Sequence, residues 1–125
     1  MGYDAEVDFG GLVGKRIRAV VGLEVGSDTV YFDCQDGSAY VMYHRQDCCE
    51  NVSVEEVVGD VADLFDAEVL SAEESANTDN PPECNDDFLW TFYRITTSKG
   101  LVVIRWLGTS NGYYGVNVSF EKAAK

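Results

Sequence analysis

The sequence predicts an α+β domain, with a mainly antiparallel sheet of about six or seven strands and one short helix in the middle of the chain. Apolar residues recur with a period of two, Gly-containing turns separate the apolar runs, and one helix-capping sequence interrupts them. The chain has 125 residues, of which 46% are hydrophobic, so it can bury one core without disulfides. We expect a single domain over residues 1–125, with an N-terminal tail at 1–11.

The first predicted strand runs from Arg16 to Val25, where alternate residues share one apolar face: Ile17, Ala19, Val21, Leu23 and Val25. A hairpin follows, because Val30–Gln35 and Ser38–Tyr43 flank the dipeptide Asp36-Gly37, which is typical of a two-residue type I′ turn. Such a turn pairs Cys34 with Ala39, Phe32 with Val41 and Val30 with Tyr43. All six residues would then lie on one buried face.

The helix is predicted from Val54 to about Asp60, because Ser53-Val-Glu-Glu56 has the spacing of a capping box. A strand is expected at 67–73, and an acidic polar loop at 75–87 within the domain. Three more strands close the chain, at 88–97, 101–107 and 113–120, with turns at 98–100 and 111–112.

Acidic residues are concentrated in one block. Between Gln46 and Tyr93 lie fourteen of the 22 Asp and Glu residues and no Lys or Arg. The rest of the chain contains the other eight acidic residues and all nine basic residues, so its charge is nearly balanced. A block of one sign repels nucleic acid and anionic membranes and attracts basic surfaces. We therefore expect a basic protein partner, and neither nucleic acid nor a membrane. Alternatives are a solvated face that keeps the protein soluble, or a calcium or magnesium site, for which the Asp-x-Asp-x-Asp-Gly spacing is absent.

Within this surface, the predicted helix and its exit would hold their carboxylates most rigidly. Tyrosines in the turn near Asn111 would add large contact area at low entropic cost. The residues expected to bind the partner are Glu55, Glu56, Asp60, Asp63, Asp66, Tyr113 and Tyr114. The basic cluster Lys15, Arg16 and Arg18 is expected to pair with the chain's own carboxylates.

A different hypothesis concerns the cysteines. His44, Cys48 and Cys49 offer soft ligands for zinc, and Cys84 or Cys34 would complete a set of four. Adjacent cysteines on a strand point to opposite faces, however, and small buried cysteines are the simpler interpretation. His44 and Cys48 also stand four residues apart, as a base and nucleophile on one helical turn would. Since no orienting group or oxyanion site is evident, we expect no enzymatic activity and no cofactor.

No stretch is long and apolar enough for a membrane span, and the N-terminus does not have the pattern of a signal peptide, so the cytoplasm is the expected location. In that reducing compartment, disulfides are not expected.

Several stretches together resemble a known family: YHRQDCCE (43–50), VGD (58–60), AEE (72–74), WTFYRITTSKG (90–100), IRW (104–106) and SNGYY (110–114). The chain resembles, from about Leu12 to Phe120, a family of small proteins of unknown function encoded in bacteriophage and prophage genomes. The resemblance implies a phage or prophage origin and a bacterial host cytoplasm, but no activity.

Acidity and the resemblance together lead to one expectation. The protein would be a phage-type acidic binding protein that inhibits a basic host nucleic-acid-binding or defence protein by mimicking nucleic acid, as anti-restriction or anti-CRISPR proteins do. The alternative is a small zinc-binding or Cys-dependent catalytic protein that uses His44, Cys48 and Cys49.

Overall fold

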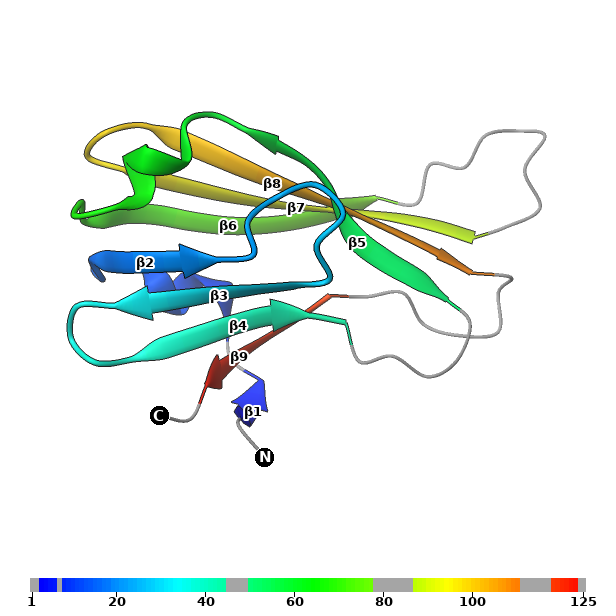
Figure 1. Ribbon diagram of the computed structural model, residues 1–125, viewed down its shortest axis with the longest axis horizontal. Coiled ribbons are helices and arrows are strands. Elements are labelled where there is room, and N and C mark those ends of the chain that lie inside the picture. The colour runs from blue at the N-terminus through cyan, green and yellow to red at the C-terminus, as the bar shows by residue number, and fades with distance from the viewer. Residues whose placement is uncertain (1–2, 7, 45–49, 78–86, 111–117, 124–125) are drawn as a thin grey trace.

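The computed structural model describes residues 3–6, 8–44, 50–77, 87–110 and 118–123, which fold into two antiparallel sheets stacked as layers (Figure 1). The five-stranded sheet has the order β1-β9-β4-β3-β2, and the four-stranded sheet has the order β5-β8-β7-β6. The strands are β1 Tyr3–Glu6, β2 Ile17–Val21, β3 Thr29–Cys34, β4 Ala39–Tyr43, β5 Asn51–Val58, β6 Val69–Asn77, β7 Asp87–Thr97, β8 Leu101–Ser110 and β9 Ser119–Ala123. Two 3₁₀ turns, η1 Phe9–Leu12 and η2 Val61–Leu64, are the only helical elements among these residues.

The predicted α+β class is therefore wrong, and so is the helix at 54–60. Residues 51–58 form β5, which pairs antiparallel with β8 along its length, with one bulge between Val54 and Glu56. Val52 and Val54 are buried, so a period of two governs this segment and the capping-box spacing at Ser53 is fortuitous. Tertiary pairing with β8 outweighs the local helix signal.

The hairpin of β3 and β4 exists, but its predicted register is wrong by one residue. Gly37 donates its N–H to the Cys34 carbonyl at 3.1 Å, and Cys34 donates to the Ser38 carbonyl at 2.9 Å, so the loop has three residues. Gly37 has φ 91°, as expected for a type I turn followed by a bulge residue in the left-handed region. Phe32 therefore pairs with Tyr40 rather than with Val41.

This shift reverses the faces of β4. Tyr40 and Met42, which the predicted register placed outside, lie in the core between the sheets. Ala39, Val41 and Tyr43 turn to the opposite side, where they form a small cluster with Ala123.

A bulge similarly changes β2. The pairing with β3 shifts between Ile17 and Ala19, so the residue that packs on the core further along is Val20. Val21, expected on the buried face, is 64% exposed. A bulge inserts one residue into the alternation and so inverts the faces beyond it.

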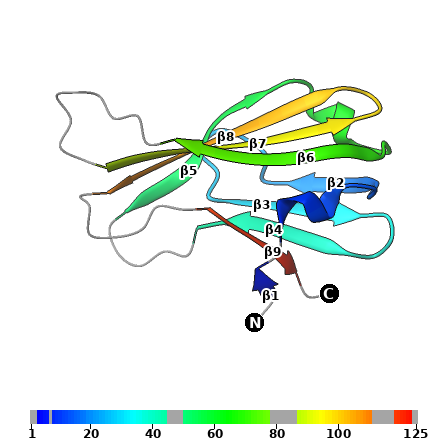
Figure 2. The ribbon, with the colours of Figure 1, turned by 180° about the vertical axis from the view of Figure 1, so that it is seen from behind.

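The core lies between the two layers. Its largest fully buried side chains come from both sheets and from η1: Trp106, Tyr93, Phe9, Phe32, Leu12, Ile17 and Met42. Phe9 projects from η1, the short blue coil in Figure 2, and its ring contacts Tyr93 at 4.7 Å and Phe120 at 5.0 Å between ring centroids. The stretch expected to be a tail thus contributes β1, which pairs with β9, and a turn that fills the core.

The layers are also joined by backbone hydrogen bonds at two places. At one end, Gly14 donates to the Val69 carbonyl and Val69 donates to the Lys15 carbonyl, both at 2.8 Å. At β5, the opposite edge strand of the four-stranded sheet, Gly26 donates to the Val54 carbonyl and Val54 donates to the Ser27 carbonyl, again at 2.8 Å. These bonds satisfy part of the edges of β6 and β5, which would otherwise expose unpaired backbone groups.

The C-terminal strands agree with expectation at β7 and β8, and β6 begins near the predicted strand but continues to Asn77. Of the predicted 75–87 loop, residues 78–86 lie outside the described part, while 75–77 and 87 belong to strands. The predicted strand at 113–120 lies mostly outside it as well, and β9 begins at Ser119. Among the residues described, no helix has the length and apolarity to cross a membrane.

We predict that Gly37→Ala lowers the free energy of unfolding by about 1 kcal/mol, because a residue with a Cβ resists the left-handed region. An added Cβ would meet no atom within 4 Å, so the cost is conformational. Urea denaturation measures it. Gly11→Ala is the matched control: it also adds a Cβ in open space but needs no positive φ. Equal stability of the two variants would contradict the turn type.

Candidate partner-binding surface

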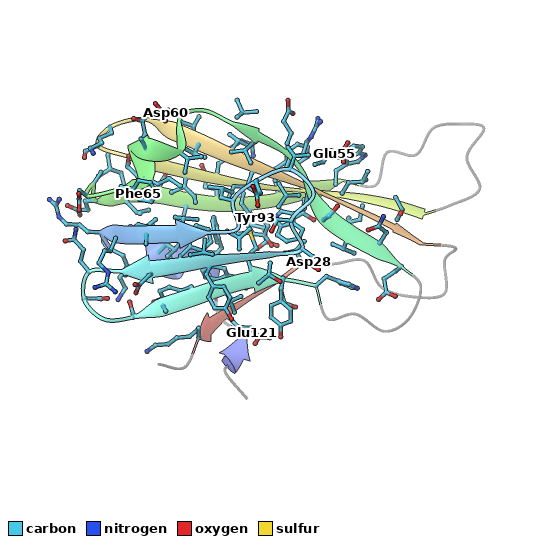
Figure 3. All side chains as sticks on the ribbon, in the orientation of Figure 1. Asp28, Glu55, Asp60, Phe65, Tyr93 and Glu121 are labelled. Atoms are coloured by element: carbon cyan, nitrogen blue, oxygen red, sulfur yellow. The ribbon has the colours of Figure 1, made fainter. Side chains whose placement is uncertain are left out.

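Four block carboxylates gather where η2 leads into β6: Asp60, Asp63, Asp66 and Glu68, called the acidic corner below. Figure 3 places Asp60 and Phe65 at the same end of the molecule. Three of the four were expected in the binding set. Glu68 was not, although its place between the buried residues Ala67 and Val69 follows the alternation of a strand.

The fold fixes the positions of three of these carboxylates. Asp60 is the N-cap of η2, and its side chain accepts from the Ala62 N–H at 3.0 Å. Asp66 has φ 57° and accepts from Gln35 Nε2 at 2.6 Å. Asp63 lies against Gly100, where an added Cβ would come within 2.5 Å of Asp63 Oδ2. The corner is thus held by contacts with the β3–β4 and β7–β8 turns.

Glu55 and Glu56 do not join this corner. In Figure 3, Glu55 and Asp60 lie towards opposite ends of the four-stranded sheet, which is what a strand of eight residues rather than a helix produces. Glu56 accepts from Arg105 Nη2 at 3.2 Å on the outer face of that sheet. The predicted set of carboxylates is therefore split between two places on the molecule.

Most of the cations near the block are engaged elsewhere. Lys15 pairs with Asp36 at 2.6 Å and Arg18 pairs with Asp33, as expected for the basic cluster, and both acids lie outside the block. Arg16 and Lys99 approach the corner but donate to backbone carbonyls, Arg16 to that of Asp66 at 3.1 Å and Lys99 to that of Phe65 at 2.8 Å.

As a result, several block carboxylates have no ion-pair partner among the described residues. Within the described part of the chain, no Lys or Arg forms an ion pair with the carboxylates of Glu55, Asp60, Asp63, Asp66, Glu68 or Glu73. The two carbonyl-bound cations moderate the field at the corner, but they leave its carboxylate oxygens available to a partner.

Two ionisable groups of the β3–β4 hairpin are perturbed. Hydrogen bonds from the Lys15 ammonium and then from Ser38 hold the pKa of Asp36 well below its ordinary range. Burial raises the pKa of the Cys34 thiol, which therefore behaves as an apolar core side chain rather than a thiolate ligand.

His44 lies in a buried ion-pairing geometry. Its Nε2 is 2.7 Å from Glu50 Oε2, and the two side chains are 5% and 0% exposed. His44 continues the inward alternation of Tyr40 and Met42, and Glu50 precedes the inward residue Val52. The pair therefore closes the core at the end where β4 stops and β5 starts, which is a structural role for both side chains.

The zinc and thiol hypotheses receive no support from this geometry. Cys48, Cys49 and Cys84 lie outside the described residues. Cys34 is at the turn end of β3, about 20 Å along the hairpin from His44 at a rise of about 3.3 Å per residue, so it cannot complete a site there. In the described part of the chain, no three His, Cys, Asp or Glu side chains gather closely enough to hold a metal. Tyr113 and Tyr114 also lie outside it.

Comparison with known proteins places most of the chain in one family. A family model described as a domain of unknown function matches residues 11–120. No curated protein and no solved structure matches the chain. The family description supplies no activity, ligand or partner, so these have to be inferred from the molecule itself.

We predict that His44→Leu lowers the free energy of unfolding by about 3 kcal/mol, because it leaves the buried Glu50 carboxylate without its imidazole. Chemical denaturation followed by tryptophan fluorescence measures the change. The double variant His44→Leu/Glu50→Leu should be more stable than the single one, since it also removes the buried carboxylate that lost its imidazole neighbour. A single variant as stable as the parent would show that the pair does not hold the core together.

We also predict an acid-sensitive contribution from Asp36. Its folded pKa lies below the ordinary value of 3.8, so its ionised form stabilises the fold above about pH 4, and this stabilisation disappears as the pH falls below that value. Asp36→Asn should therefore be less stable than the parent at neutral pH, with the difference shrinking as the solution is acidified. Glu73→Gln, an exposed carboxylate without an ion pair, is the control and should show no such convergence.

Proposed function

Because this chain belongs to the DUF7448 family, a domain of unknown function, we propose its function from its own surface: a non-enzymatic protein that docks its acidic corner onto a basic protein. The observation that carries the proposal is that capping and turn contacts hold Asp60, Asp63 and Asp66, and that none of the four corner carboxylates forms an ion pair with a Lys or Arg in the described part of the chain. A charged patch that only kept the protein soluble would not need capping bonds and turn contacts to set its spacing.

The charge distribution around the acidic corner favours a cationic partner. Lys15 and Arg18 pair with carboxylates outside the block, although the neighbouring Arg16 reaches the corner. The field of the corner therefore extends into solvent, where it attracts cationic surfaces and repels nucleic acid and anionic lipid. Complementary fields of this kind accelerate association and select the partner.

Mimicry of nucleic acid is the specific form that we propose. Duplex DNA presents about one negative charge per 1.7 Å of its axis, so a protein that holds several carboxylates at fixed spacing can occupy a groove evolved for phosphates. The target would be a basic host protein that binds nucleic acid or acts in defence. The sequence resemblance to phage and prophage proteins supports this target class, and the complex would form in the cytoplasm of the bacterial host.

We predict that the variant Asp60→Asn/Asp63→Asn/Asp66→Asn/Glu68→Gln weakens capture of basic proteins from a bacterial lysate at least about tenfold, mainly through slower association. Asn remains a good N-cap at 60 and tolerates the positive φ at 66, so the fold is retained. Added duplex DNA should displace the captured protein. Raising the salt should do the same, because the Debye length is about 10 Å at 0.1 M and shorter above it.

The matched control neutralises four exposed carboxylates elsewhere: Glu24→Gln, Asp28→Asn, Glu55→Gln and Glu73→Gln. It changes the net charge equally but leaves the corner intact, so it should keep most of the binding. If both variants lose the same amount of binding, the corner acts only through its contribution to the net charge. Unchanged binding of the corner variant would overturn the proposal.

A further inference from the structure

The outer face of the four-stranded sheet has a composition unusual for a solvated surface. On β7 and β8, the side chains pointing away from the core include Trp90, Phe92, Arg94, Val103, Arg105 and Leu107, with Thr96 and Thr109 near the strand ends. Their neighbours Tyr93, Ile95, Ile104 and Trp106 are buried inside. An antiparallel sheet with one wet face normally alternates apolar and polar residues. These two central strands carry large apolar side chains on both sides, as strands covered on both faces do.

The described elements leave this face uncovered. Figures 1 and 2 show the four-stranded sheet as the outermost layer, with no described strand over its outer side. The apolar surface continues to Val58 on β5, which pairs with Val103, and to Leu101 on β8. Val58 and Leu101 are 51% and 49% exposed.

Two arginines lie over aromatic rings on this face. The guanidinium carbon of Arg105 lies 4.9 Å from the Trp90 ring centroid, and Arg94 lies 5.7 Å from that of Phe92. Arg105 also pairs with Glu56 at 3.2 Å, and Arg94 donates to Ser75 Oγ at 3.1 Å. Aromatic and Arg side chains with restricted rotamers are the types that dominate protein interfaces, because little entropy remains to be lost on binding.

The charges of this face nearly balance. Arg94 and Arg105 occupy the central strands, and Glu56 and Glu73 occupy the two edge strands at the same levels. Glu55, beside Glu56 at the bulge of β5, is the third exposed carboxylate of the face. The described face thus carries two positive and three negative side chains, a net charge of −1 in a protein of net charge −13. A surface whose charges nearly cancel can face a copy of itself with little net repulsion.

We propose that this face binds a second copy of the chain, forming a two-fold symmetric dimer by packing sheet against sheet. A two-fold interface uses the same patch on both subunits, so the central arginines of one copy can reach rings or rim carboxylates of the other. Four strands about 4.8 Å apart and about 33 Å long offer roughly 600 Å² per copy, near the roughly 800 Å² of a standard interface. The inference does not depend on the acidic corner.

Analytical ultracentrifugation of the full chain, from micromolar to several hundred micromolar, tests the proposal. A dimer is expected, and Val103→Glu should raise its dissociation constant about 30-fold or more, the loss typical of a central interface residue. Val21→Glu is the matched control, because it places the same charge on an exposed valine of the other sheet. Salt should strengthen the dimer by screening the net charge, whereas it should weaken the complex of the acidic corner with a basic protein.

A second measurement needs no variant. Trp106 is fully buried, so acrylamide quenching in the native protein reports mainly on Trp90. Quenching should decrease over the concentration range in which the dimer forms. A chain that stays monomeric throughout, equal effects of Val103→Glu and Val21→Glu, or quenching that does not change as a dimer forms would each overturn the proposal.

Discussion

The register of the β3–β4 hairpin is the constraint on which most of the structure depends. The three-residue loop that ends in Gly37, with φ 91°, pairs Phe32 with Tyr40 and Val30 with Met42. This register turns Met42 into the core, where its sulfur accepts from the indole N–H of Trp106 at 3.0 Å. A shift of one residue would present the other face of β4 and leave that buried indole N–H unsatisfied.

The same alternation carries over to the buried contact of His44 with Glu50. His44 lies two residues beyond Met42 on the inward face, and Glu50 lies two residues before Val52 on the facing sheet. Their contact closes the interlayer core at the end opposite the Gly37 turn. The turn at one end of the hairpin thus determines which side chain seals the other end.

The fold also separates two surfaces of different character. Around η2, a capping bond holds Asp60 and contacts with the neighbouring turns hold Asp63 and Asp66, while the nearest cations bind backbone oxygens. On the outer face of the four-stranded sheet, arginines lie over aromatic rings and the charges nearly cancel. Long-range attraction governs recognition at the first surface, whereas apolar burial and short-range complementarity govern it at the second.

The sequence by itself determined the positions of most strands, because a period of two in β3, β4, β7 and β8 marks a strand wherever it pairs. It also determined the charge block, and the pairing of Lys15 and Arg18 with the chain's own acids was anticipated from it. Only the tertiary structure decided that residues 51–58 form a strand, since the edge of β8 offered partners that a local capping signal cannot report. The bulge at Ile17 and the Gly37 loop each shift the alternation by one residue, and a period of two conceals such a shift. Strand pairing also separates the carboxylates of η2 from those of β5. The distance between two such side chains depends on which strands pair with each other, and not on the number of residues between them in the sequence.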